Sequence, residues 1–273
     1  MSWKPSVVAA LLVALSAALA PAVAVPERGP IRIAYERPED KTHQPIYRTL
    51  RDGRALERIR DRLADWRLPR RITIRTKGCD GEISAWYDPS HTTVTICYEY
   101  IAYIQDLAHT IGPAAAAEGV TPENFVVGPL LDVMLHELAH AVFDLKKIPI
   151  LGREEDAADQ VAAYVLLEHG GRDTRRTIAS IGSIHAGQVT QAPPELKDFA
   201  GEHGLPAQRF FNLMCLSYGK DPKAFGDLVP KGFLTEERAQ LCEHEYRQVS
   251  FAVQRLIMPT LKGPRRRVAT RDR

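Results

Sequence analysis

Alternation of hydrophobic and polar positions predicts short strands in the first hundred residues. Apolar residues alternate with polar ones over residues 31–36 and again around Ile72 and Ile74, which is the period of a half-buried strand. Residues 82–87 and 92–98 alternate in the same way on either side of the sequence DPSH. Proline, aspartate and serine favour turns, so these two segments predict a hairpin.

Helical spacing of apolar positions governs most of the remaining chain. The periodicity predicts helices over residues 44–66, 98–117, 129–146, 153–169, 206–218 and 235–258. A loop rich in Gly, Ser and Pro is expected between the fourth and fifth of these helices. The expected fold class is therefore α+β, with a small, mostly antiparallel sheet packed on a helical core and a C-terminal helical part.

The two ends of the chain are expected to lie outside this fold. Residues 1–24 contain Lys4, an apolar run and the small-residue sequence Ala22-Val23-Ala24, in the order typical of a secretory signal peptide. The last eleven residues, 263–273, form a basic tail with little to bury, which predicts disorder. The expected organisation is a signal peptide over 1–24, one domain over 25–262 and the tail.

Composition narrows the possible partners. The formal charge of +2 is too small to indicate nucleic-acid binding. No segment after the signal peptide is expected to span a membrane.

The chain has four cysteines, and in an exported protein an even number suggests disulfides. Of the three possible pairings we favour the two local ones, Cys79–Cys97 and Cys215–Cys242. Free buried thiols are the alternative.

The segment 133–145, VMLHELAHAVFDL, carries a metal-site motif inside an apolar helix. At about 100° per residue, His136, Glu137 and His140 lie on one side of that helix. Two histidines one turn apart can bind the same zinc ion, and the glutamate between them can take a proton from a zinc-bound water. The structural alternative is that both histidines are core residues with one hydrogen bond each. However, this helix is apolar nearly all round, and burying an unpaired glutamate in it would cost free energy.

A catalytic zinc ion needs a third protein ligand, and the helix over residues 153–169 begins with acids. Glu155 and Asp159 lie one turn apart at the centre of its inward face. Glu155 is therefore the expected third ligand. Asp159 is expected to accept the second ring N–H of a ligand histidine. Glu154 and Asp156 lie about 100° to either side, where acids favour a helix N-terminus.

These motifs resemble the gluzincin metallopeptidases, the clan of thermolysin-like enzymes. More closely, HELAHAVFDL, PILGREEDAADQVAA and MCLSYGKDP resemble DUF4344, a family of secreted bacterial metallopeptidases known mainly as a domain of unknown function. The resemblance covers most of the mature chain. It implies that His136, His140 and Glu155 hold one zinc ion, that Glu137 activates water and that Asp159 supports a histidine.

The resemblance also implies a place for the substrate. In thermolysin-like enzymes an edge strand before the zinc helix binds the peptide through backbone hydrogen bonds. Ser84, Ala85 and Trp86 resemble that strand, although an ordinary sheet edge would look the same. The clan's oxyanion-stabilising His and Tyr have no clear match here. Candidates by residue type are His185, His203, Tyr164 and Tyr218, of which Tyr218 is the first to test because it falls in a stretch that resembles the family.

The sequence as a whole predicts an exported zinc metallopeptidase, periplasmic or extracellular, that acts on peptides or proteins. Two other functions stay open. One is a zinc hydrolase of another amide bond, such as a cell-wall amide, because the motif alone does not select the bond. The other is a zinc-stabilised binding protein without activity. Glu137 argues against the second, because zinc retention does not need it.

Overall fold

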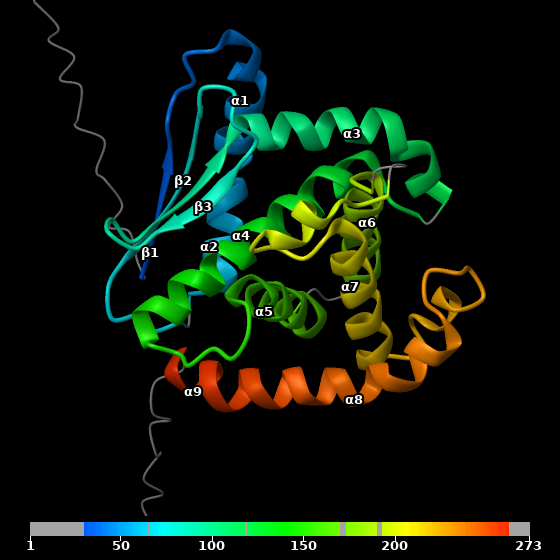
Figure 1. Ribbon diagram of the computed structural model, residues 1–273. Helices are drawn as coiled ribbons and strands as arrows, with labels where there is room; N and C mark the ends of the chain where they lie inside the picture. The colour runs from blue at the N-terminus through cyan, green and yellow to red at the C-terminus, as the bar shows by residue number, and fades with distance from the viewer. Residues whose placement is uncertain (1–29, 65, 118, 170–172, 190–192, 262–273) are drawn as a thin grey trace, which may run out of the picture.

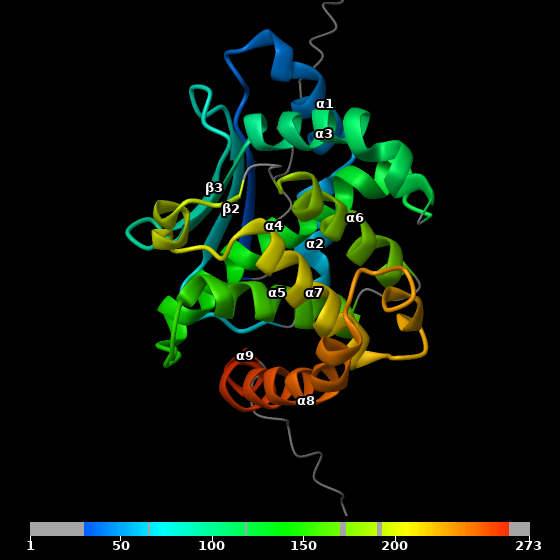
Figure 2. The same cartoon turned by 45° about the vertical axis from the view of Figure 1, so that its right-hand side comes forward.

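The computed structural model describes residues 30–64, 66–117, 119–169, 173–189 and 193–261. The predicted signal peptide and the predicted basic tail lie outside these residues. The single domain expected over residues 25–262 remains a prediction. Figures 1 and 2 show a small sheet on one side of the molecule and helices on the other, with α4 running between them.

The sheet has four strands in the order β1-β2-β4-β3. They are β1 (Ile31–Tyr35), β2 (Ile72–Lys77), β3 (Ala85–Asp88) and β4 (Thr93–Cys97). The predicted hairpin is confirmed, because β3 pairs with β4 in antiparallel register with Tyr87 opposite Val94. β3 is an edge strand, and its outer side faces α4.

The prediction of a mostly antiparallel sheet was wrong. β1 pairs with β2 in parallel, and β2 pairs with β4 in parallel. Helices α1 (Gln44–Asp52) and α2 (Ala55–Arg62) connect β1 to β2, and a helical crossover returns the chain in the same direction. After β2 the chain reverses direction through β3, which forms the outer edge of the sheet. It reverses again at the hairpin turn, so β4 lies between β2 and β3 and is parallel to β2.

Three helix predictions also need correction. The helix expected over residues 44–66 is interrupted at Gly53 and Arg54, where Arg54 adopts a left-handed conformation with φ of 50°. The motif helix α4 (Pro122–Lys146) begins earlier than expected, because the Thr121 side chain accepts the Asn124 N–H and caps it. The expected loop after residue 171 contains a helix, α6 (Thr174–Gly187), followed by a short 3-10 turn, Leu196–Ala200.

The remaining helices agree with the periodicity in type and approximate extent. They are α3 (Tyr98–Ala117), α5 (Glu154–His169), α7 (Pro206–Lys220) and α8 (Glu236–Ala252), which a π turn, Val253–Ile257, continues. A short helix that was not predicted, α9 (Met258–Leu261), follows the π turn. α8 and α9 lie along the lower side of the molecule in Figure 1.

Helix α4 contributes to two large hydrophobic cores, and its first turn contributes Phe125 to a third, smaller one. Met134 and Leu138 pack in the core beneath the sheet, while Leu135 and Val142 pack in the core formed with α5, α7 and α8. The helix therefore needs apolar residues on two sides, which explains its nearly continuous apolar sequence. One remaining strip, at His136, Glu137 and His140, faces the cavities described below.

The apolar character of α4 has a second consequence. Asn124–Lys146 is long and apolar enough to span a membrane, contrary to the expectation for this part of the chain. However, 67% of its most apolar window is buried inside the molecule. The helix packs against both cores, so its apolar composition is that of a buried core helix.

Helix α6 packs unusually close to α4. A Cβ atom added at Gly128 of α4 would lie 2.0 Å from the Ser180 Oγ of α6. A side chain at this position would displace the Ser180 hydroxyl and press on the Thr177 carbonyl oxygen at 3.2 Å, so glycine suits this approach. The close packing brings His185, near the end of α6, to the same cavity as α4 residues Asp132 and His136.

Both predicted disulfides are present. Cys79–Cys97 joins the loop after β2 to the end of β4, and Cys215–Cys242 joins α7 to α8. The two bridges fit an exported protein, because disulfides persist in oxidising compartments.

Candidate metal centre and active-site cleft

Two helices bring together the residues that could hold a metal ion. His136 and His140 lie one turn apart on α4, and Glu155 lies in the first turn of α5. Their ligand atoms form a compact triangle: His136 Nε2 lies 2.9 Å from Glu155 Oε2, His140 Nε2 lies 3.1 Å from His136 Nε2, and His140 Nε2 lies 3.4 Å from Glu155 Oε2.

The triangle fits a zinc ion. Zinc binds nitrogen and carboxylate oxygen at about 2.0–2.2 Å in tetrahedral geometry, which separates neighbouring ligand atoms by about 3.3 Å. The three observed separations lie close to that value. Three protein ligands leave a fourth tetrahedral position free, as in catalytic zinc sites.

Carboxylates behind the two rings fix which nitrogen faces the centre. His136 Nδ1 lies 2.8 Å from Asp159 Oδ1, and His140 Nδ1 lies 2.8 Å from Glu154 Oε1. A carboxylate accepts a hydrogen bond there, so in the neutral rings each Nδ1 carries the N–H and each Nε2 presents a lone pair to the centre. Two nitrogen lone pairs and a carboxylate oxygen then point at one another, an arrangement that only positive charge stabilises.

The pKa values of the ligand groups indicate the same preference. Burial lowers the pKa of His136, but its hydrogen bonds with Asp159 and Glu155 outweigh burial and raise it to about 10. The hydrogen bond with His136 lowers the pKa of Glu155 to about 2. Both shifts mean that positive charge is favoured at the point where these groups meet.

A buried arginine holds the carboxylate behind His136. Arg209 of α7 donates from Nε to Asp159 Oδ2 at 2.8 Å and from Nη2 to Asp159 Oδ1 at 2.7 Å. Although burial raises the pKa of Asp159, the hydrogen bonds from His136 and Arg209 keep it below its usual value. The chain Arg209–Asp159–His136 therefore fixes the orientation of one predicted ligand from a third helix.

Glu137 is buried next to the three ligand atoms but is not one of them. Burial raises its pKa, while His136 and His140 act in the opposite direction. The backbone N–H of Tyr87 on β3 hydrogen-bonds its carboxylate. The Tyr87 hydroxyl also donates to Asp144 Oδ2 at 2.8 Å, so the edge strand is attached to α4 at two points.

His203 lies on the segment before α7, which passes across α4 toward β3 (Figures 1 and 2, yellow). Its Nε2 lies 2.8 Å from Glu155 Oε2, and its ring stacks on that of His136 with centroids 5.8 Å apart. Burial lowers the pKa of His203, which favours its neutral form. It is thus one of two oxyanion candidates from the sequence that line a cavity at the site; the other is His185.

The two tyrosine candidates lie elsewhere. Tyr218 packs against the helical core, and Tyr164 stacks on Tyr246 within it. Neither lines the cavities beside the predicted ligands. The choice of Tyr218 as the first candidate therefore has no support from its position.

Two cavities meet at Glu137, with Ala85 and His203 in the walls of both. One, of about 420 Å³, extends past Trp86 toward His140 and Glu154. The other, of about 270 Å³, extends past Ser84 toward Asp132, His185 and Arg209. Together they form a cleft that runs along β3 on either side of the candidate metal centre, and we call it the β3 cleft.

Comparison with known proteins agrees with this geometry. The family DUF4344, described as "Putative metallopeptidase", matches residues 35–257. The chain belongs to this family. No curated protein and no solved structure matches the chain significantly. The match begins at the last residue of β1 and ends before α9, so it includes the other three strands, the candidate metal centre, α7 and α8. A peptidase family implies protein substrates.

Hydrogen bonds in the structure give two further residues a place at the site, Glu154 and Arg209. Glu154 was interpreted as a helix N-terminal acid, yet it hydrogen-bonds the ring of His140. Arg209 was not singled out, yet it holds Asp159. His140, as the second predicted ligand histidine, also needs an acceptor for its ring N–H, and this could have indicated Glu154. Arg209 lies 50 residues from Asp159, and no local pattern marks it.

Proposed function

We propose that this chain is an exported zinc metallopeptidase, periplasmic or extracellular, that hydrolyses peptide bonds. The observation that carries the proposal is the triangle of His136 Nε2, His140 Nε2 and Glu155 Oε2, with the buried Glu137 carboxylate beside it. Family membership supports the activity, and the two disulfides support export. The roles given below to individual residues are part of the proposal.

Zinc, when bound, supplies Lewis acidity that polarises a substrate carbonyl and makes a water more acidic. His136, His140 and Glu155 would hold it, with Asp159 and Glu154 fixing the two rings. Glu137 would take the proton of the attacking water on its carboxylate and pass it to the leaving amine. Its raised pKa suits this second step, because a carboxyl group that binds the proton more strongly can carry it between the two atoms.

The edge strand would bind the peptide backbone. Cys97 N donates to Ser84 O, so in the alternating antiparallel pattern Ser84 and Trp86 direct their backbone groups toward β4. Ala85 and Tyr87 direct theirs outward, where the Tyr87 N–H meets Glu137. We therefore assign backbone binding of the substrate to Ala85 and to the Tyr87 carbonyl. Ser84 and Trp86 contribute to the walls of the β3 cleft.

His203 would stabilise the oxyanion that forms as water attacks. Its neutral ring lies within hydrogen-bonding distance of a predicted zinc ligand, from a segment on the opposite side of the cleft to β3. Replacing His203 with Ala should lower kcat by about 100-fold or more, which is the usual effect of losing one oxyanion donor. Zinc content should not change. His91→Ala in the exposed hairpin turn is the matched control and should retain full activity.

Digestion of a peptide library, analysed by mass spectrometry, tests the proposed function. The wild-type protein should cleave peptides, and Glu137→Gln should not. A folded, zinc-loaded protein that cleaves no peptide would contradict the proposal.

A further inference from the structure

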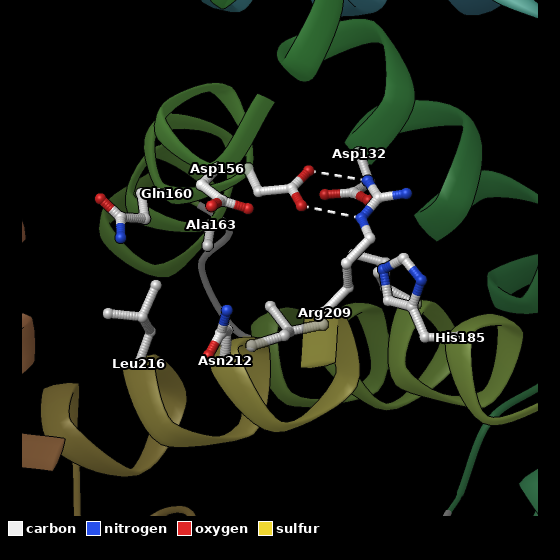
Figure 3. Close-up of a pocket in the computed structure, with 11 residues that line it drawn as sticks. Asp132, Asp156, Gln160, Ala163, His185, Arg209, Asn212 and Leu216 are labelled. Atoms are coloured by element: carbon white, nitrogen blue, oxygen red, sulfur yellow. Dashed lines mark hydrogen bonds and ion pairs between the residues drawn. The ribbon is translucent and has the colours of Figure 1, made fainter. Parts of the chain in front are cut away.

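The smaller half of the β3 cleft ends in a polar wall that the proposed chemistry does not use. This cavity of about 270 Å³ is far larger than the roughly 15 Å³ that one water molecule needs, so a side chain can enter it. Asp132, His185 and Arg209 line it, together with Glu137 and His136. Figure 3, a close-up of the adjoining pocket between α5 and α7, shows Asp132 and His185 beside the guanidinium group of Arg209.

Asp132 presents a carboxylate that has no partner within the part of the chain that the structure describes. It lies one turn before His136 on α4, and no hydrogen bond or ion pair to its side chain is found among the described residues. Burial raises its pKa to about 6; nearby Asp159 adds to that rise, and Arg209 opposes it. An acid in this environment gains from a hydrogen-bond donor or a cation that enters the cavity.

Arg209 does not neutralise this wall. Two of its N–H groups are committed to Asp159, shown by the dashed lines in Figure 3. Asp132, Asp159 and Arg209 together therefore carry one net negative charge. The two positive charges of a divalent metal ion at His136 Nε2 would be offset by the carboxylates of Glu155 and Glu137, so the net negative charge of this wall would remain.

His185 adds an acceptor to the same wall. Burial lowers the pKa of its ring to about 4, so the ring is neutral near pH 7. The Gln188 side chain hydrogen-bonds the ring, whereas the buried Nδ1 has no partner among the described residues. A buried acceptor without a partner is unfavourable, and a donor on a bound molecule would satisfy it.

We propose that this cavity binds the side chain of a lysine or arginine residue next to the scissile bond, so that the enzyme prefers basic peptides. The inference rests on the proposed peptidase function and adds a substrate class to it. A basic side chain brings several N–H donors and one positive charge to a wall that offers two unpartnered acceptors and one net negative charge. A carboxylate side chain would face Asp132 and be excluded.

The position of the cavity supports this assignment. Ser84 and Ala85 line its entrance, and Glu137 lies where it meets the larger cavity. A peptide bound along β3 therefore has its reacting carbonyl near Glu137 and one neighbouring side chain at this cavity.

Cleavage of a peptide library by the wild-type protein and by Asp132→Asn tests the proposal. Lysine and arginine should be enriched about tenfold or more at one position that flanks the cut, as expected for a hydrogen bond to a charged group. Asp132→Asn should lose this enrichment but still cleave peptides with uncharged residues there. Asp106→Asn, an exposed acid on α3, is the matched control and should keep it. His185→Leu, which removes an acceptor but no charge, should weaken it less.

Binding measurements separate this proposal from the proposed function. Zinc-loaded Glu137→Gln should bind a labelled peptide with lysine at the flanking position about tenfold more tightly than its norleucine counterpart, and adding Asp132→Asn should remove the difference. Cleavage without a basic preference, or a preference that survives Asp132→Asn, would overturn the cavity assignment alone. If the wild-type protein cleaves no peptide, the proposed function fails. If zinc-loaded Glu137→Gln also binds the lysine and norleucine peptides with equal affinity, the cavity assignment fails too.

Discussion

Replacing Glu137 with Gln should lower peptide hydrolysis by about two to four orders of magnitude, which is the range for loss of a general base. The amide is nearly isosteric and can still accept the hydrogen bond of the Tyr87 N–H. It cannot accept the proton of the attacking water. Because Glu137 is not among the three grouped ligand atoms, zinc content should stay the same. Steady-state kinetics on a cleaved library peptide, beside elemental analysis, measures both quantities.

The matched control is Glu99→Gln, the same chemical change in the first turn of α3. It should leave kcat unchanged, because Glu99 contacts the backbone around Cys79 and Gly81 rather than the β3 cleft. Activity that persists in Glu137→Gln would contradict the role given to this carboxylate. Loss of zinc in the same variant would instead show that Glu137 is a ligand.

Removing the metal with a chelator should lower the midpoint of thermal unfolding substantially. Without the metal ion, a proton on His136, whose pKa is raised to about 10, is left to offset the Glu155 carboxylate, and the stabilisation supplied by bound zinc is lost. Zinc at about a thousand times its dissociation constant stabilises a folded protein by about 4 kcal/mol. For a chain of this size that corresponds to about 8–16 °C. Thermal scans with chelator, and again after zinc is restored, measure the shift.

The Glu155→Ala variant provides the comparison. It removes one predicted ligand from the first turn of α5, so its unfolding midpoint should respond little to chelator or zinc. A wild-type midpoint that is unaffected by chelator, in a protein shown to contain zinc beforehand, would mean that the metal does not stabilise the fold.

The candidate metal centre could be predicted to the extent that it is built from local helix geometry. His136, Glu137 and His140 are one turn of a single helix, and helical phase alone places Glu155 and Asp159 on one face of the next. Glu154 was missed because phase describes a side chain's direction and not its reach. At the first residue of α5 the carboxylate extends to the ring of His140. Arg209 and His203 reach the site from distant segments, which no local period reveals.

The sheet and α6 show the same limit. Alternation of apolar and polar residues predicts that β1, β2 and β4 are strands, but it does not distinguish parallel from antiparallel pairing. The parallel pairing, which the crossover through α1 and α2 produces, therefore could not be predicted from it. The sequence of α6 contains glycines and serines that resemble a loop. In the structure Gly182 and Ser180 are buried where the helix packs closely on its neighbours, while Ile178, Ile181 and Ile184 supply the apolar face.

Metal content is the measurement that tests the central claim most directly. The protein should be purified without a metal-affinity column or chelator, and zinc measured by elemental analysis in the wild type and in Glu155→Ala. About one zinc ion per wild-type chain, and much less in the variant, is the result expected for a three-ligand site. A folded wild-type protein that stays free of metal after zinc is supplied would contradict it. His136 and His140 would then be core histidines, and the proposed hydrolysis would have no metal centre.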